Sequence, residues 1–111
     1  MEKKIRPGYW ESGGKNPFWL NVVDDQVFWL GMNQANKDQR QGANWCHVGC
    51  GKIHDDTLEL TWSDIPAGRD QLHGRIVIKI IDATHMAVVE DSGGFGRSEW
   101  HWVDAVRNFT Q

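Results

Sequence analysis

Short apolar runs recur along the chain about every ten residues, and turn-forming residues such as Gly, Asn, Asp and Pro separate them. Within many runs apolar and polar side chains alternate, which is typical of a strand with one face against a core. The pattern predicts eight strands, at residues 8–12, 18–23, 26–33, 44–54, 57–65, 74–81, 85–91 and 97–103. Eight strands in a meander can close on themselves and leave no exposed edge. We therefore expect an all-β fold, an eight-stranded antiparallel up-and-down barrel, with a short helical turn at residues 104–109 as an optional addition.

In most of the expected hairpins, one register gathers the apolar residues on one face and the polar residues on the other. For the hairpin that turns at residues 55–56, this register sets Ile53 opposite Leu58, Gly49 opposite Trp62 and His47 opposite Asp64. For the hairpin that turns at residues 82–84, it sets Glu90 opposite Ile76 and Met86 opposite Ile80. For the hairpin that turns at residues 92–96, it sets Glu90 opposite Ser98 and Met86 opposite Trp102. For the hairpin at residues 24–25, a turn of two residues gathers the apolar residues on one face, but a turn of three residues fits nearly as well.

Tight and long connections alternate along the expected meander, so each kind gathers at one end of the barrel. The tight, acidic turns lie at residues 24–25, 55–56 and 82–84, and the long loops at residues 13–17, 34–43, 66–73 and 92–96. The polar residues predicted on the inner faces all fall at the long-loop end: His47, Asp64, Glu90 and Ser98. Long loops on a rigid scaffold are frequent binding sites. We therefore expect a binding mouth at this end.

A closed barrel of eight strands has room for filling side chains or for one small ligand. We expect the protein to bind a compact, partly apolar small molecule at the mouth. The expected ligand-binding residues are Trp29, Trp62 and Trp100 as walls and His47, Asp64, Glu90 and Ser98 as polar contacts, with Asn33 and Asn44 on the rim. We expect no metal and no other cofactor.

Two other functions stay open at this point. In the first, the carboxylate of Asp64 raises the pKa of His47 and fixes its tautomer, and the pair performs acid/base chemistry together with Glu90. The His47–Asp64 pair is also compatible with a purely structural role at the rim. In the second, Trp19 or Trp45 faces outward and forms a homodimer without any ligand, because large apolar patches rarely stay exposed to water.

Composition narrows the classes of function. The chain has 111 residues, enough for one domain over residues 1–111, and its net charge of −3 argues against nucleic-acid binding through a basic face. We expect no membrane partner, since no apolar run approaches the ~20 residues of a spanning helix. The charged residues 1–7 lack the apolar stretch of a secretory signal behind them.

The two cysteines, Cys46 and Cys50, fall on one expected strand. Their positions along such a strand are about 13 Å apart, which is too far for a disulfide or for sharing one zinc ion. We therefore expect free thiols, which are typical of a reducing compartment, and a cytoplasmic location.

The segment Gly8-Tyr9-Trp10 on the first expected strand fits the G-x-W signature of the calycins. Through this segment and the meander, the chain resembles that group, which comprises lipocalin-like, fatty-acid-binding and avidin-like barrels. The resemblance implies that Trp10 plugs the closed end beneath a basic side chain from near the carboxyl end, either Arg107 or Arg97.

A second resemblance is carried by the G-Y-W segment, by W-S-D-I-P at residues 62–66, by Gly74 and by S-G-G-F-G at residues 92–96 through Trp100. With these segments the chain resembles a family of small, uncharacterised bacterial barrel proteins. The resemblance spans roughly residues 8–102 and implies the barrel but no particular activity.

Overall fold

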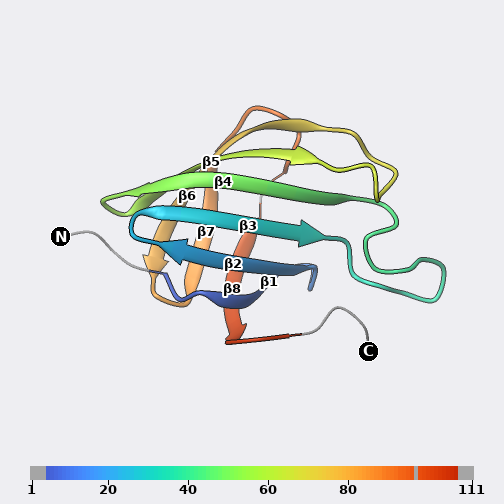
Figure 1. The fold of residues 1–111 in the computed structure, drawn as a ribbon, viewed down its shortest axis with the longest axis horizontal. Helices are drawn as coiled ribbons and strands as arrows, with labels where there is room; N and C mark the ends of the chain where they lie inside the picture. Colours follow the sequence, from blue (N-terminus) through green and yellow to red (C-terminus); the bar gives the residue numbers. More distant parts are fainter. Residues whose placement is uncertain (1–4, 97, 108–111) are drawn as a thin grey trace.

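The computed structural model describes residues 5–96 and 98–107, and over these residues it contains eight strands and no helix. In chain order the strands are β1 (Gly8–Ser12), β2 (Pro17–Val23), β3 (Gln26–Met32), β4 (Cys46–His54), β5 (Thr57–Asp64), β6 (His73–Asp82), β7 (His85–Asp91) and β8 (Glu99–Asp104) (Figure 1). Each strand pairs antiparallel with the next, and β8 pairs with β1, so the sheet closes into a barrel. The predicted all-β, eight-stranded up-and-down barrel is confirmed.

The carboxyl-terminal part of the chain differs from the expectation of a helical turn at residues 104–109. Asp104 still belongs to β8, and residues 105–107 form no helical turn. Residues 108–109 of that turn lie outside the described residues, as does Arg97 at the expected start of the last strand.

The hairpins with two-residue turns adopt the registers expected from side-chain alternation. In the β4–β5 hairpin, Ile53 pairs with Leu58, Gly49 with Trp62 and His47 with Asp64. In the β2–β3 hairpin, Val23 pairs with Gln26, so this turn has two residues. Asp24 and Asp55, the first residues of the two turns, have φ angles of 58° and 56°. Two-residue hairpin turns need such left-handed positions, and Asp is one of the few residues besides Gly that tolerate them.

The register of β7 differs from the prediction and moves Glu90 out of the barrel. Between Val77 and Ile78 of β6 the pairing shifts by one residue, so Glu90 lies opposite Val77 rather than Ile76, and its side chain is exposed. An extra residue in one strand reverses the inward and outward alternation beyond it, and alternation alone does not show where such a bulge falls. The predicted inward placement of Glu90 is therefore wrong.

The pairing of β7 with β8 is displaced by two residues, with Met86 opposite Trp100 rather than Trp102. The backbone N–H of Val88 correspondingly donates to the carbonyl oxygen of Ser98, at 2.9 Å. Because side chains alternate with a period of two, this displacement keeps Trp100 on the inner face.

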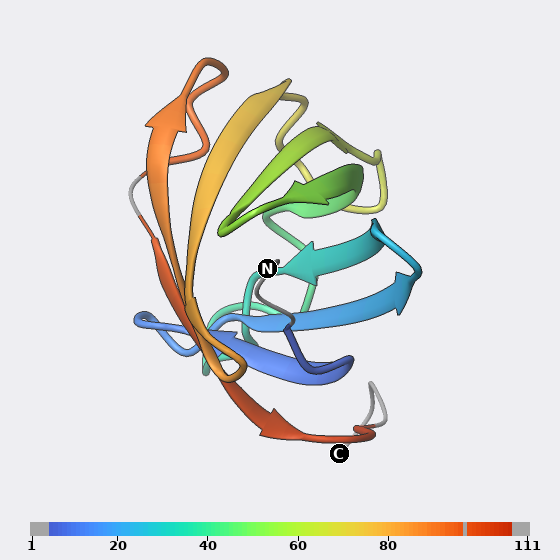
Figure 2. The same ribbon diagram turned by 90° about the vertical axis from the view of Figure 1, so that its left-hand side faces the viewer.

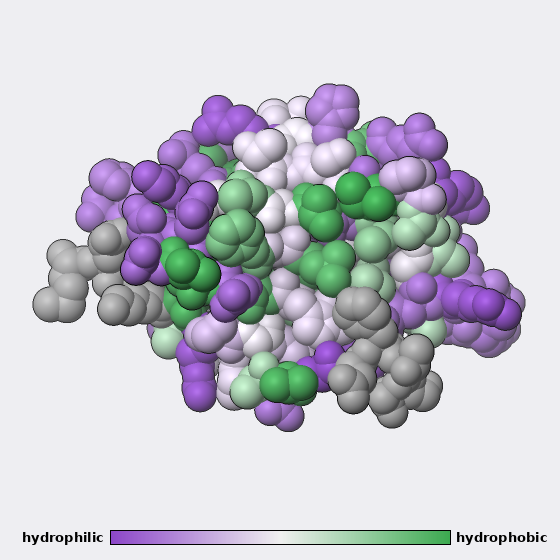
Figure 3. All heavy atoms as spheres, viewed as in Figure 1, coloured by the Kyte–Doolittle hydropathy of each residue, from purple (hydrophilic) through white to green (hydrophobic). Residues whose placement is uncertain are grey.

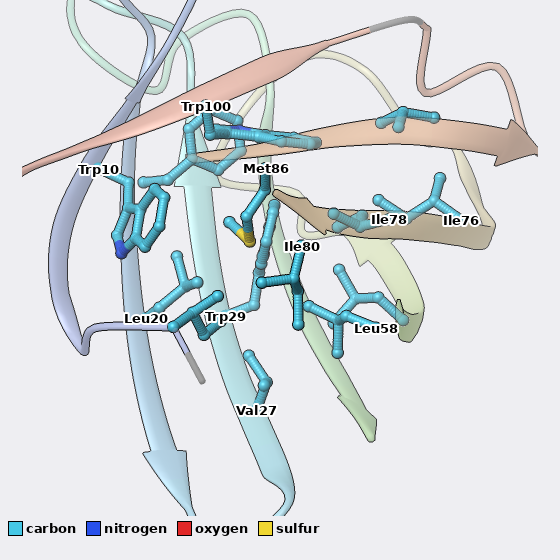
Figure 4. Packing of buried hydrophobic residues seen from close by; sticks show 14 of the residues in the cluster. Trp10, Leu20, Val27, Trp29, Leu58, Ile76, Ile78, Ile80, Met86 and Trp100 are labelled. Atoms are coloured by element: carbon cyan, nitrogen blue, oxygen red, sulfur yellow. The ribbon is translucent and has the colours of Figure 1, made fainter. Parts of the chain in front are cut away.

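The barrel end with the tight turns is filled by apolar side chains and covered by the amino-terminal segment. The side chains of Leu58 and Ile80 are fully buried, and Ile5 joins the same core (Figure 4). The backbone N–H of Arg6 donates to the carbonyl oxygen of Ala83 in the β6–β7 turn, at 3.0 Å. Figure 2 faces this end and shows the strands curving around the interior of the barrel. This end is therefore closed.

Two arginines stack on aromatic rings near the chain termini. Trp10 is fully buried, and its indole N–H donates to the carbonyl oxygen of Arg6 at 2.9 Å. Arg107, which the resemblance to calycins places over Trp10, lies over the neighbouring ring of Tyr9, 4.7 Å from its centroid. The guanidinium of Arg6 lies 3.9 Å from the ring centroid of Trp102. These contacts fasten both terminal segments to the barrel.

Hydrophobic residues on the face over β2, β3 and β4 are scattered among polar ones (Figure 3), and they include Phe28 and Val48. Trp19 and Trp45, considered above as a homodimer surface, are both half-buried. The indole N–H of Trp19 donates to the carbonyl oxygen of Arg107 at 2.9 Å, and Trp45 packs against the core. The homodimer stays a prediction.

Candidate functional site

The long-loop end of the barrel opens into a cavity of about 280 Å³. Strand ends and four connections supply its lining, namely the β1–β2 loop, the loop before β4, the β5–β6 loop and the β7–β8 loop. The smaller members of the lining are Ser12, Asn16, Leu72, Gly94 and Ser98. The largest side chains of the wall carry aromatic rings, and its charged members are two carboxylates.

Five rings make up the aromatic part of the wall: Phe18, Trp45, His47, Trp62 and Phe95. The other four rings pack around His47. Its ring centroid lies 5.1 Å from that of Trp45, 5.2 Å from that of Phe95, 5.5 Å from that of Trp62 and 5.7 Å from that of Phe18. Trp45 is nearly parallel to His47, at 11°, whereas the other three rings are inclined to it by 50° to 55°. We refer to these five rings as the aromatic box.

His47 is held in one tautomer by Trp29, whose indole N–H donates to its Nε2 at 2.8 Å. A ring nitrogen that accepts a hydrogen bond carries no proton, so the neutral ring has its proton on Nδ1. Burial lowers the pKa of His47 to about 4, so the ring is neutral at pH 7. Activation of His47 by Asp64, considered from the sequence, is not observed, because burial dominates the pKa and Trp29 sets the tautomer.

Gly31 of β3 makes this arrangement of rings possible. It lies opposite His47, and a Cβ atom there would be 2.4 Å from the ring of Phe18 and 2.9 Å from Nε2 of His47. Both distances are far below van der Waals contact. A side chain at this position would therefore push Phe18 and His47 out of place.

Two buried indole N–H groups have no hydrogen-bond partner within the described residues, those of Trp62 and Trp100. The two residues are 3% and 2% exposed, respectively. A buried donor without a partner costs about 1–3 kcal/mol, and native proteins rarely keep one without a reason. Trp62 belongs to the cavity lining and Trp100 does not, so an acceptor bound in the cavity could satisfy Trp62.

The charged side chains in the described part of the lining are Asp64 and Asp70. Asp64 anchors the β5–β6 loop, because its Oδ2 accepts the backbone N–H of Leu72 at 2.8 Å while its own N–H donates to the carbonyl of Leu72 at 2.7 Å. Burial and, secondly, the charge of Asp64 raise the pKa of the neighbouring thiol of Cys46. With His47 neutral, the described lining is negatively charged at pH 7.

Phe95 reaches the cavity because the carboxylate of Asp91 folds the β7–β8 loop around itself. The backbone N–H groups of Gly96, Gly93 and Phe95 donate to it at 2.9, 3.0 and 3.1 Å. These hydrogen bonds, with that of Gly96 the strongest, hold the pKa of Asp91 below its usual range. Gly94 and Gly96 have φ angles of 79° and 93°, which favour glycine.

The two expected rim residues organise the loop before β4 and do not line the cavity. The side-chain oxygen of Asn33 accepts the backbone N–H groups of Asn44 and Trp45, at 2.8 and 3.1 Å. The side-chain oxygen of Asn44 accepts a hydrogen bond from Arg69 at 2.7 Å. Both asparagines therefore position Trp45.

The structure brings together four of the seven ligand-binding residues expected from the sequence: His47, Trp62, Asp64 and Ser98. Trp29 and Trp100 are buried next to the aromatic box without lining the cavity, since Trp29 holds His47 and Trp100 packs on Phe18 and Phe95. Glu90 is exposed and outside the cavity, which is a correction. Because of the bulge in β7, the acid/base alternative loses its second group.

Several lining residues were not expected from the sequence. Phe18 and Trp45 share the inward alternation of Leu20 and His47, so a stricter reading of the pattern would have found them. Phe95 and Asp70 lie in loops, where no periodicity indicates direction.

Comparisons with models of protein families, with curated protein sequences and with solved structures found no match to this chain. The resemblance to calycins and to the bacterial barrel family therefore stays a prediction. No helix in the described part of the chain is long and apolar enough to cross a membrane. Nor do three or more His, Cys, Asp or Glu side chains of the described residues gather as a metal site.

Proposed function

We propose that this protein binds a compact, partly apolar small molecule in the cavity at the long-loop end. The observation that carries the proposal is the cavity itself, whose lining includes Trp62, a buried residue with an indole N–H that has no partner among the described residues. An acceptor atom of a ligand would remove the cost of about 1–3 kcal/mol that this donor otherwise imposes. The aromatic box supplies the apolar contacts.

The size and polarity of the cavity limit the ligand. Its volume of about 280 Å³ is that of about nine water molecules in the liquid, which suits a ligand of about ten non-hydrogen atoms. The N–H groups of Trp62 and His47 would bind acceptors such as carbonyl oxygens, while Asp64 and Asp70 would accept hydrogen bonds from donors or attract positive charge.

An NMR titration with a library of small fragments tests the proposal, with the indole N–H signals of the protein as the readout. We expect bound fragments to shift the signal of Trp62. The signal of Trp102 should stay in place, because its indole donates to the carbonyl of Pro7 at 3.1 Å, away from the cavity. If no fragment shifts the Trp62 signal, the cavity is not a binding site. Where fragments do shift it, native mass spectrometry of protein taken from its source cells would identify the natural ligand.

Two matched variants sharpen this test. Trp62→Phe keeps an aromatic ring but removes the N–H, and we expect it to weaken the binding of those fragments about tenfold, which corresponds to ~1.4 kcal/mol. Trp100→Phe removes an equally buried and unpartnered N–H that lies outside the lining. The affinity of the Trp100→Phe variant for the fragments should stay within about twofold of that of the parent protein. Equal losses in both variants would contradict a specific hydrogen bond to Trp62.

We also propose that the protein is a calycin-like barrel located in the cytoplasm. The closed eight-stranded meander and the burial of Trp10 on β1 support the first part. Cys46 and Cys50 are free thiols, which supports a reducing compartment.

A further inference from the structure

We propose that the ligand of this cavity carries an alkylated ammonium group, and that the aromatic box and the carboxylates of Asp64 and Asp70 select it over an uncharged molecule of the same shape. This inference rests on the proposed function, since it names the chemical class of ligand for the same cavity. Three features of the lining support it: the angles between the rings, the charge, and the position of the unpartnered indole N–H.

The rings of the aromatic box meet at steep angles. Phe95 stands edge-on to Trp62, at 74°, and both are inclined by more than 50° to His47. The parallel pair, Trp45 and His47, is already in contact at 5.1 Å, whereas two rings that sandwich a flat ligand stand about 7 Å apart. The inclined rings therefore offer no parallel slot for a flat ligand, and aromatic rings attract alkylated ammonium ions.

The charge of the lining favours a cation. In its described part, Asp64 and Asp70 are negative, and no Lys or Arg side chain is present. His47, the basic group of the wall, is neutral at pH 7 because it is buried. An anion would therefore find no opposite charge in this part of the wall, while a cation would find two carboxylates in a partly aromatic wall.

The unpartnered N–H of Trp62 indicates the other end of the ligand. Trp62 and Asp64 both lie on β5, two residues apart and on the same face, so their positions differ by about 6.6 Å along the strand. Asp64 is nearer the mouth, and Trp62 is deeper. The structure thus assigns the ammonium group to the mouth and an acceptor, such as a carbonyl oxygen, to the deeper end.

Two probes of the same shape test this inference: acetylcholine, and its uncharged carbon analogue 3,3-dimethylbutyl acetate. Both carry the ester carbonyl, and only the first carries the cation. We expect acetylcholine to bind at least about tenfold more tightly, as measured by the shift of the Trp62 indole signal during titration. In the double variant Asp64→Asn/Asp70→Asn, this preference should fall below about threefold, because Asn keeps the hydrogen-bonding oxygen without the charge.

The control is the double variant Asp25→Asn/Asp56→Asn, which removes the same number of charges at the closed end, where both carboxylates are exposed. It should keep the preference for acetylcholine. Equal or tighter binding of the uncharged ester would overturn the ammonium proposal and leave the binding site standing. If fragments shift the Trp62 signal but neither probe does, the ammonium proposal alone fails. If no fragment and no probe shifts it, both proposals fail.

Discussion

The two ends of this barrel are formed by the same eight strands and yet differ in almost every physical respect. At the closed end, two-residue turns join the strands, aliphatic side chains fill the interior, and Ile5 covers it. At the open end, long loops leave a cavity of about 280 Å³ with aromatic walls, two carboxylates and an unpartnered N–H. Closely packed apolar groups stabilise the fold, whereas unsatisfied polar groups beside a cavity raise its energy unless a ligand binds. One end therefore stabilises the fold, and the other holds the cavity in which we propose that a ligand binds.

The largest effect should come from the closed end. Leu58→Ala removes a fully buried side chain near the β4–β5 turn, and we expect a loss of about 2–5 kcal/mol in the free energy of unfolding. Urea denaturation followed by tryptophan fluorescence measures this loss. As a control, Leu72→Ala truncates a half-exposed side chain of the open end and should cost far less. Similar losses in both variants would contradict the division between the two ends.

The open end should make the stability sensitive to pH. The pKa of His47 is about 4 in the folded protein and about 6.5 when unfolded, so between these values the unfolded chain binds more protons. Above pH 6.5 this contribution to stability is complete; it falls as the pH drops from 6.5 to 4, by roughly 3 kcal/mol in all. Urea denaturation at a series of pH values measures it.

Two variants assign this pH dependence to the right imidazole. His47→Gln should abolish most of the slope between pH 4 and 6.5. His54→Gln, which removes an exposed imidazole in the β4–β5 turn, should leave it. A slope that persists in His47→Gln would show that other groups cause it.

The smallest of the three effects concerns the packing of the aromatic box. Gly31→Ala places a methyl group within 2.4 Å of the ring of Phe18, so we expect a loss of about 1–3 kcal/mol in stability and weaker binding of the cavity fragments. Gly13→Ala makes the same change where no atom lies within 4 Å and should have little effect on either. If the Gly31→Ala variant binds the fragments with the same affinity as the parent protein, the arrangement of the aromatic box does not depend on this glycine.

Most of the fold could be predicted because its information is local. Alternation along β4 and β5 sets His47 opposite Asp64, and a one-residue slip would have turned Ile53 and Leu58 toward water. The tight turns at Asp24 and Asp55 add backbone conformations that few residues adopt. Three of the expected site residues, His47, Trp62 and Asp64, follow from this alternation alone.

The remaining features depend on contacts between distant parts of the chain. The bulge that turns Glu90 outward lies in a strand whose residues would alternate equally well without it. Phe95 and Asp70 enter the cavity from loops, whose direction is set by what they pack against rather than by any period. The low pKa of His47 arises from burial among rings that include Phe18, Trp62 and Phe95, which come from distant parts of the chain. Side-chain alternation is a property of neighbouring residues, whereas burial and the approach of loops exist only after the barrel has closed.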